Sequence, residues 1–386
     1  MTRIVSFDLF AVDLPFRRPF RHSAACRHTS DSIFLKCTTD SGAVGYGECL
    51  PRSYVTGESR DSTYLLLLDV ILPRLVGKKF ESYPAVEAFL HDCNGRAPVE
   101  WVRPGVPQTA AWCAVDLALL DTFGHEFGRP VFHSDGINPL PYIRYSGVLQ
   151  SDSGLKLVKS CVLFRLFGFR QVKMKVGWDG DIAAIRTVRR ILGPKVDIRV
   201  DANMAWNFEQ ALRTMREMSL WGVRCFEQPV AADALDEMSE LVRETGFTVM
   251  ADESFSHPDS LLALVEKGAC NAVNVRISKC GGLIASLRCC QEAHRAALTI
   301  QVGCQVGESS LLSVAQQALL AQVRAVLYAE GCFGRYLLRE DVAEPLLQFG
   351  YAGRPPKTPT GPGLGVTIDE TRLRRWTVRS DRIAAD

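Results

Sequence analysis

The fold is decided by residues 171–279, where apolar runs end in charged residues: QVKMK (171–175), IRVD (198–201), CFE (225–227), TVMAD (248–252) and AVNVRISK (272–279). The final residues of these runs follow one another at intervals of 26, 26, 25 and 27 positions, and they are Lys175, Asp201, Glu227, Asp252 and Lys279. Such an interval accommodates one strand and one helix. Each charged residue is therefore expected at the carboxyl end of a successive parallel strand, the edge where barrel enzymes build active sites.

The same alternation of short apolar runs and helix-length segments continues on both sides of this stretch. It predicts eight strands, at Tyr142–Leu149, Gln171–Val176, Val196–Val200, Val223–Phe226, Phe247–Ala251, Ala272–Ile277, Leu298–Val302 and Ala325–Tyr328. Strands separated by helices pair in parallel through right-handed crossovers, and eight such units favour closure into a barrel.

The first third of the chain has a different pattern. Strands are expected at 4–14 and 32–48, with a hairpin turn at 40–42, and helices at 59–77, 83–93 and 107–126. A tail rich in Gly and Pro (350–366) is expected to fold back onto this lobe. The predicted organisation is a capping domain (1–139), a barrel (140–345) and a C-terminal segment returning to the capping domain (346–386).

Composition excludes several classes of protein. The chain has 386 residues, 47% hydrophobic and 23% charged, with a net charge of +2, which is typical of a globular protein without a nucleic-acid or membrane surface. No apolar run approaches the roughly 18 residues of a membrane span, and a signal-peptide pattern is absent, so a cytoplasmic location is expected. Thirteen cysteines without a CxxC pair indicate reduced thiols rather than a zinc site or a disulfide framework.

Three carboxylates placed side by side at one barrel edge, those of Asp201, Glu227 and Asp252, would repel one another. A divalent cation removes that cost, and carboxylate oxygens suit Mg²⁺ or Mn²⁺. The alternative is that each acid caps the helix that follows it.

Lysines complete the predicted site. Lys173 and Lys175 lie two apart, so both project into the barrel, whereas Lys279 follows a strand on the other side. A free lysine is protonated at neutral pH, but a second ammonium and a metal ion lower its pKa. A general base raises the reaction rate only about 10²–10⁴-fold, whereas enzymes commonly need about 10⁶-fold or more. The remaining rate enhancement must come from stabilising the dianion that forms when a carboxylate loses its α-proton. Lysines on opposite faces could remove a proton from one side and return it on the other. Solvated surface lysines are the alternative, which the apolar residues around Met174 disfavour.

Five motifs in this order resemble the enolase superfamily, and more narrowly its muconate lactonizing (muconate cycloisomerase) subgroup. They are KMK (173–175), VDAN (200–203), FEQP (226–229), ADES (251–254) and SKCGG (278–282), and the likeness extends over nearly the whole chain. The resemblance implies an α/β fold, a modified (β/α)7β TIM-like barrel with an N-terminal α+β capping domain. It also implies Mg²⁺ held by Asp201, Glu227 and Asp252, acid/base roles for Lys175 and Lys279, and a substrate-carboxylate contact for Lys173.

The mandelate racemase branch is disfavoured, because its strand-seven base is a histidine and none occurs near 301–303 here. The expected activity is a metal-dependent isomerase, either a cycloisomerase or a racemase/epimerase. Alternatives are a lyase of the o-succinylbenzoate synthase type, a dipeptide or N-acylamino acid epimerase, and a catalytically silent binding protein. The eighth strand carries one acid, Glu330, where dipeptide epimerases carry an acid-x-acid pair, which weakens the dipeptide alternative.

Substrate contacts are expected from the loops at 17–29 and 50–58 and from the end of the last strand. The individual candidates for substrate binding or support of the site are Asn203, Arg52, Tyr54, Glu308 and Glu330. A basic cluster in the first loop, with Arg17, Arg18, Arg21, His22, Arg27 and His28, could clamp an anionic group or simply face solvent. The Gly-x-Gly at 45–47, on the strand predicted over 32–48, and the three glycines at 361–365 are interpreted as turns rather than phosphate-binding loops. The expected partner is a small-molecule carboxylate, with no nucleic acid or membrane, in a homo-oligomer.

Overall fold

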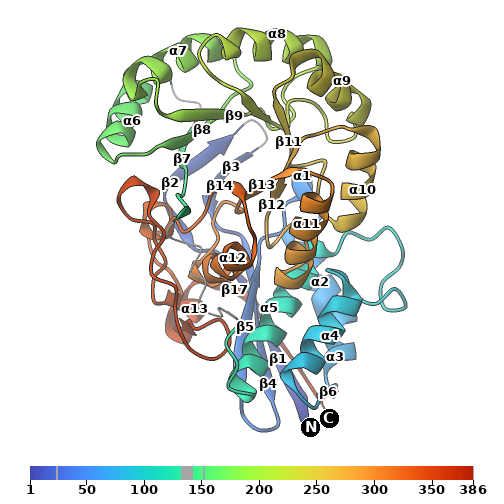
Figure 1. The fold of residues 1–386 in the computed structure, drawn as a ribbon. Coiled ribbons are helices and arrows are strands. Elements are labelled where there is room, and N and C mark those ends of the chain that lie inside the picture. The colour runs from blue at the N-terminus through green and yellow to red at the C-terminus, as the bar shows by residue number, and fades with distance from the viewer. Residues whose placement is uncertain (23–24, 132–141, 151–152, 386) are drawn as a thin grey trace.

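A curled parallel sheet surrounded by helices dominates the protein, in a computed structural model that describes residues 1–22, 25–131, 142–150 and 153–385. In Figure 1 the helices α6 to α10 form an arc around these strands, and an antiparallel sheet extends below them. Both chain termini lie at the far end of that second sheet. None of the described helices is long and apolar enough to cross a membrane.

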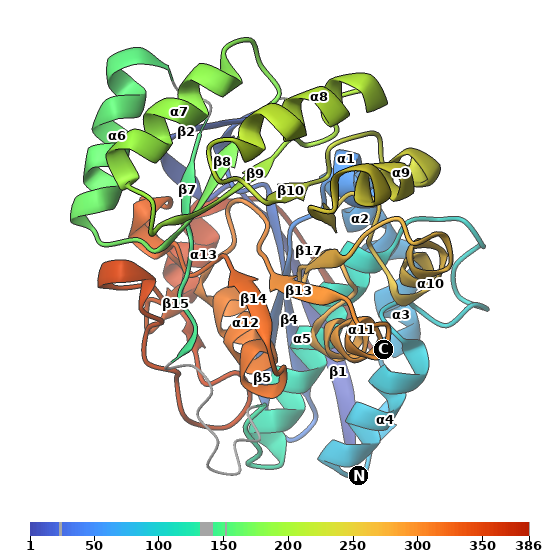
Figure 2. The same cartoon turned by 45° about the horizontal axis from the view of Figure 1, so that its top comes forward.

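The parallel sheet follows the chain in order from β7 to β14, and every neighbouring pair is parallel. Its strands are β7 (Gly147–Leu149), β8 (Gln171–Lys175), β9 (Asp197–Asp201), β10 (Cys225–Glu227), β11 (Thr248–Ala251), β12 (Ala272–Val275), β13 (Thr299–Val302) and β14 (Val326–Ala329). The two edges meet where Tyr145 bridges Ala329 and the Ser146 N–H donates to the Ala329 carbonyl at 2.9 Å. The sheet is thereby closed into a barrel (Figure 2).

Seven helices connect the eight strands, one between each consecutive pair. They are α6 (Gly154–Leu166), α7 (Asp181–Leu192), α8 (Phe208–Ser219), α9 (Leu235–Thr245), α10 (Pro258–Lys267), α11 (Leu283–Arg295) and α12 (Ser310–Gln322). The predicted (β/α)7β barrel is confirmed, with two local differences. The first strand begins at Gly147 rather than at Tyr142, and Lys279 lies in a turn four residues beyond β12, closed by its N–H donating to the Arg276 carbonyl at 3.0 Å.

The antiparallel sheet contains β1 (Thr2–Val12), β4 (Ser32–Thr39), β5 (Val44–Cys49) and the short β6 (Lys79–Phe80). Its helices are α1 (Ser53–Thr56), α2 (Arg60–Leu66), α3 (Leu72–Leu75), α4 (Tyr83–Cys93) and α5 (Thr109–Glu126). The single helix predicted over 59–77 is interrupted by a π-helical turn, Leu67–Ile71, between α2 and α3.

One element of this lobe was not predicted. The residues predicted as a loop at 17–29 form a β-hairpin of β2 (Pro15–His22) and β3 (Ala25–Thr29). Outside the hairpin, Phe16 of β2 bridges Leu338, and the Arg17 N–H donates to the Leu337 carbonyl at 2.8 Å. The first strand of the hairpin, PFRRPFRH, contains two prolines and three arginines, which are uncommon in sheet interiors. The pattern therefore gave no strand signal, and the hairpin depends on tertiary contacts.

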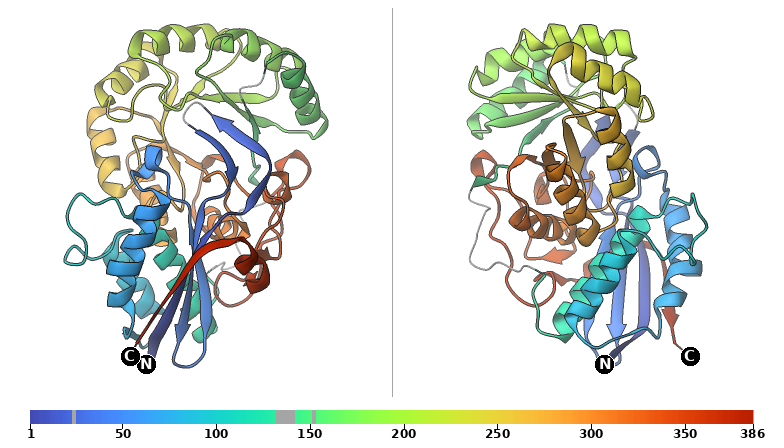
Figure 3. Two further views of the ribbon diagram at one scale, coloured as in Figure 1. Left: turned by 180° about the vertical axis from the view of Figure 1, so that it is seen from behind. Right: turned by 45° about the vertical axis from the view of Figure 1, so that its right-hand side comes forward.

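The C-terminal segment returns to the N-terminal sheet. It contains β15 (Ala343–Glu344), β16 (Thr367–Ile368), α13 (Glu370–Trp376) and β17 (Thr377–Ala384). Strand β17 pairs antiparallel with β1, so the last strand lies beside the first (Figure 3). The domain boundary predicted at residue 139 lies outside the described residues.

Helix α5 packs so closely against β5 that glycine is required at positions 45 and 47. Residues Thr109 to Gly124 of the helix are all buried. A Cβ atom on Gly47 would lie 1.9 Å from the Ala114 carbonyl oxygen, and one on Gly45 would lie 2.1 Å from the Thr122 nitrogen. The interpretation of residues 45–47 as a turn was therefore wrong, because the glycines lie within a strand and admit the main chain of α5.

Replacing Gly47 by Ala should lower the free energy of unfolding by about 1–3 kcal/mol or more, because the added methyl overlaps a main-chain carbonyl. Urea denaturation measures this change. Gly350→Ala is the matched control, since Gly350 has a φ of −93° and its nearest prospective contact is 3.9 Å away. Equal stability of the two variants would contradict this account of the β5–α5 contact.

Candidate active site

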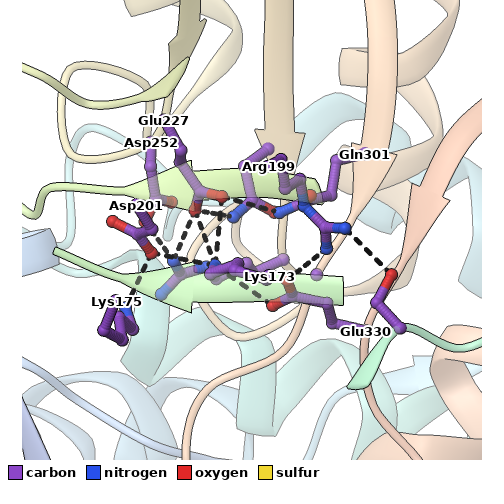
Figure 4. A network of polar contacts seen from close by, with 12 residues as sticks. Lys173, Lys175, Arg199, Asp201, Glu227, Asp252, Gln301 and Glu330 are labelled. Atoms are coloured by element: carbon purple, nitrogen blue, oxygen red, sulfur yellow. Dashed lines mark hydrogen bonds and ion pairs between the residues drawn. The ribbon is translucent and has the colours of Figure 1, made fainter. Parts of the chain in front are cut away.

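The charged residues predicted at the strand ends converge at one end of the barrel. Lys175, Asp201 and Glu227 are the last residues of β8, β9 and β10, and Asp252 directly follows β11. Their exposed fractions are 7%, 0%, 1% and 0%. Figure 4 shows the acids gathered on one side of Lys173, with Lys175 at the edge of the group. The acids do not cap the helices that follow their strands, because the N-caps of these helices are Asn207, Ala234 and His257.

Lys173 lies at the centre of the cluster. Its Nζ is 3.0 Å from both Glu227 carboxylate oxygens, 2.9 Å from Asp201 Oδ2 and 3.2 Å from Glu330 Oε2. Burial opposes its charge, but the three carboxylates raise the pKa of Lys173 well above its ordinary value. Lys173 is therefore an ammonium rather than a proton acceptor in this arrangement.

Lys175 and Lys279 approach the acids from opposite walls. The Nζ of Lys175 is 2.6 Å from Asp201 Oδ2 and 2.7 Å from Asn203 Oδ1. The Nζ of Lys279 lies 2.8 Å from Asp252 Oδ1 and 2.8 Å from the Asp252 carbonyl. β8 and β12 are four strands apart in a closed sheet of eight, so the two amines come from opposite sides of the barrel. Lys175 lines the cavity, whereas Lys279 is 0% exposed and does not line it.

The three acids interact strongly with one another. Burial raises the pKa of Glu227, and Asp201 and Asp252 raise it further. Burial alone would raise the pKa of the other two acids. The pKa of Asp201 is nevertheless lowered, because Lys173 and Lys175 lie beside it. The pKa of Asp252 is lowered in the same way by Arg276 and Lys279.

Within the described ranges, no three His, Cys, Asp or Glu side chains are placed to hold a metal ion. Cationic side chains lie between the acids instead: Arg276 pairs with Asp252 and is 3.6 Å from Glu227 Oε1. Three buried carboxylates gathered at one point, two of which raise the pKa of the third, Glu227, are nevertheless the donor set that a hard divalent cation stabilises. The chemistry of these donors therefore suits the metal that the motifs imply, although in this arrangement Lys173 and Arg276 pair with the same acids.

Sequence reasoning missed several polar side chains in this cluster. The Asn274 amide donates to Glu227 Oε1 at 2.8 Å, and that of Gln301 donates to Glu227 Oε2 at 3.2 Å. Arg276 and Arg199 also belong to it. A signal was available, because these residues occupy alternate, inward-facing positions of otherwise apolar strands, as in Arg199–Asp201 and Asn274–Arg276.

Glu330 follows β14 and is neutralised by two cations. Its carboxylate pairs with Lys173 and with Arg199, and the same guanidinium donates to Ser146 Oγ at 3.0 Å. Arg199 also stacks over the Tyr328 ring, 4.1 Å from its centroid. Burial opposes ionisation of Glu330, but Lys173 and Arg199 lower its pKa, so it is an ionised carboxylate with its charge already paired.

The other residues predicted as substrate contacts differ in whether they belong to the cluster, line the cavity or do neither. Asn203 has a φ of +44°, and its N–H donates to Asp201 Oδ1 at 3.0 Å, so it belongs to the cluster. Tyr54 lines the cavity next to the lysines. Glu308 does not line it; its carboxylate accepts from the Gln305 N–H at 2.5 Å, and burial raises its pKa to about 8.

Arg52 is a structural link. It is 1% exposed, and its guanidinium donates to the carbonyls of Pro51, Ser30 and Val306 at 2.8, 2.8 and 2.9 Å. These bonds connect the capping lobe with the loop after β13, and Arg52 does not line the cavity.

The side chains of Arg21 and His22 in the basic cluster of the hairpin lie outside the described part of the structure. Among the described members, Arg17 donates to the Leu338 carbonyl at 3.3 Å and Arg27 pairs with Asp31, so neither is placed as an anion clamp. Among the described hairpin residues, Phe20 lines the cavity.

Two family descriptions match this chain and together cover most of it. "Mandelate racemase / muconate lactonizing enzyme, N-terminal domain" matches residues 5–133, and "Enolase C-terminal domain-like" matches residues 157–372. The chain thus belongs to the enolase superfamily, within its muconate lactonizing-like group. It is an isomerase of the class that contains racemases, epimerases and cycloisomerases.

Curated relatives cover nearly the whole chain. The N-succinyl-L-Arg/Lys racemase of Bacillus cereus is 29% identical over 98% of this chain and 99% of its own length. Its crystal structure has a TM-score of 0.86 at 28% identity, covering 99% of this chain and 100% of that one. The L-Ala-D/L-Glu epimerase of Bacillus subtilis is 28% identical (94% and 96% covered), and muconate cycloisomerase 1 of Acinetobacter baylyi is 24% identical (96% and 98% covered).

Replacing Arg52 by Met should destabilise the fold by about 2–4 kcal/mol, because buried main-chain carbonyls lose their donors. Chemical denaturation measures the loss, and Arg18→Met, at an exposed hairpin residue, is the control. Unchanged stability combined with a raised KM would instead identify Arg52 as a substrate contact.

Proposed function

We propose that this chain is a Mg²⁺-dependent racemase or epimerase that moves a proton between the two faces of the carbon next to a substrate carboxylate. The observation that carries the proposal is the placement of Lys175 and Lys279 on opposite walls, each bonded to an acid of the same carboxylate group. An amine on either side of a planar enolate is the arrangement that inverts a stereocentre.

The chain's own side chains have distinct tasks in this reaction. Lys173, held as an ammonium by its carboxylate partners, supplies positive charge for the substrate carboxylate. Lys175 or Lys279 takes the α-proton at its Nζ, and the other amine donates a proton from the opposite side. Asp201, Glu227 and Asp252 would hold the Mg²⁺, whose charge stabilises the additional negative charge that deprotonation creates.

Sequence identity supports racemisation over cyclisation: the racemase and the epimerase named above are 29% and 28% identical to this chain, against 24% and 27% for the muconate cycloisomerases of Acinetobacter baylyi and Acinetobacter lwoffii. The paired charge of Glu330 favours an acylated amino group over a free ammonium, because an ammonium would compete with Lys173 and Arg199 for that carboxylate. We therefore favour N-acylated amino acids over dipeptides.

The two-base arrangement predicts that each single lysine substitution affects the two enantiomers of the substrate differently. Lys175→Ala and Lys279→Ala should each lower racemisation by about 10²–10⁴-fold, because one proton carrier is lost. Each variant should retain exchange of the α-proton from one enantiomer only, and the two variants should retain opposite enantiomers. Proton NMR in D₂O with both enantiomers of N-acetylated amino acids measures this.

Retention of the same enantiomer by both lysine variants would contradict the two-base arrangement. Formation of an alkene in the same NMR experiment would establish the lyase alternative instead. A wild type that is as inactive as both variants on all acids tested would favour a binding protein.

The metal proposal can be tested without turnover. Asp201→Asn should weaken Mg²⁺ binding by about tenfold or more, because one of three anionic oxygen donors becomes neutral. Calorimetric titration with Mg²⁺ measures this, with circular dichroism to verify the fold and the exposed Asp179→Asn as control. Unchanged Mg²⁺ affinity would remove Asp201 from the ligand set.

A further inference from the structure

A completely buried arginine lies beside the acid that follows the last barrel strand. Arg199 is 0% exposed and is the register partner of Lys173 on the neighbouring strand, so both side chains point to the same face of the sheet. Its guanidinium pairs with Glu330 and donates to Ser146 Oγ at 3.0 Å. The guanidinium carbon also lies 4.1 Å from the centroid of the Tyr328 ring. These neighbours hold the guanidinium in one position (Figure 4).

Glu330 connects this arginine to the cavity at the lysines. The cavity has a volume of about 680 Å³, and Glu330 lines it whereas Arg199 does not. Oxygen Oε1 of Glu330 pairs with Arg199, and oxygen Oε2 lies 3.2 Å from the Nζ of Lys173. Arg199 therefore influences what the cavity binds by acting through Glu330.

The two cations differ in how many acids they serve. Lys173 is shared among Glu330, Asp201 and Glu227. Within the described part of the chain, Arg199 has one carboxylate partner, Glu330. A carboxylate that lines a cavity attracts a ligand ammonium when an oxygen is available, because charge-assisted hydrogen bonds are strong. Here an ammonium would have to displace a cation from Glu330 and would be repelled by both of them.

We infer that Arg199 is a positioning residue for specificity: by occupying Oε1 of Glu330, it prevents this carboxylate from binding a substrate ammonium. The inference rests on the proposed function and deepens it, because it names the residue that selects a neutral acyl group. Excluding the wrong ligand through an unfavourable charge is an efficient way to achieve specificity. This residue achieves it from outside the cavity, without touching the substrate.

The test uses glycyl-L-alanine and N-propionyl-L-alanine, which differ only in an ammonium that replaces a methyl group. Calorimetric titration of the Mg²⁺-loaded protein with each compound gives the ratio of the two affinities. Wild type should prefer the propionyl compound, and Arg199→Met should shift the ratio towards the glycyl compound by about tenfold or more, because Glu330 regains an available oxygen. Arg199→Lys retains a positive charge beside Glu330 and should keep the wild-type preference.

Further variants separate this role from a merely structural one. Arg199→Gln can still donate a hydrogen bond but carries no charge, so it should reproduce the shift of Arg199→Met and provides the test if the methionine variant does not fold. Glu330→Gln added to either neutral variant should abolish the shift, because an amide does not attract an ammonium as a carboxylate does. Arg52→Met is the matched control, since Arg52 is a 1% exposed arginine that bonds main-chain carbonyls elsewhere, and it should keep the wild-type ratio.

A separate measurement distinguishes failure of this inference from failure of the proposed chemistry. Exchange of the α-proton of N-propionyl-L-alanine by wild type, followed by proton NMR in D₂O, tests the racemase proposal. Exchange combined with an unchanged affinity ratio in the neutral variants, or with a shift that persists after Glu330→Gln, would refute the role of Arg199 and leave the racemase proposal intact. A shift that depends on Glu330, without exchange in wild type, would refute the racemase proposal and leave Arg199 as a determinant of binding. Failure of every variant to bind either compound would overturn the inference.

Discussion

The active-site end of the barrel depends on a buried cluster of opposite charges. Asp201, Glu227 and Asp252 are almost completely buried, which is costly for ionised carboxylates unless cations compensate them. Lys173 contacts two of these acids, and Arg276 contacts Asp252 and approaches Glu227. Removing one partner of such a buried group typically costs about 3–5 kcal/mol, so the residues of the site also determine whether the barrel end is stable.

Different parts of the fold supply the charged cluster and the other residues that line the cavity. Parallel strands place one charged residue at each end, and closure of the sheet through Tyr145 and Ala329 brings β8 and β12 to face each other. The capping lobe contributes Phe20 and Tyr54 to the same cavity, whereas Arg52 links the lobe to the barrel. The charged cluster thus comes from the barrel, and other residues that line the cavity come from the lobe, α6 and the C-terminal segment.

The order of the barrel strands and the charged residues at their ends could be predicted from the sequence, because both follow from its regular periodicity. The spacing from Lys175 to Asp252 reports one strand and one helix at each step, and those residues lie where the spacing places them. The β2–β3 hairpin was not predictable, because prolines and arginines give no strand signal and because β2 also bonds to residues 337–339, which are far away in the sequence. Lys279 fits the same spacing although it lies in a turn, since spacing does not distinguish a strand end from the turn that follows.

Sequence alone determined which residues carry charge and at or beyond the end of which strand each one lies, since alternation and repeat length are local properties of the chain. Tertiary structure alone decided which charges neutralise each other, as for Glu330, whose partners Arg199 and Lys173 come from other strands. It also decided that Arg52 bonds main-chain carbonyls and that rings near residues 167, 333 and 349 form one wall. The physical reason is that ion pairing, burial and cavity shape depend on distances between segments far apart in the chain, and no local pattern encodes those distances.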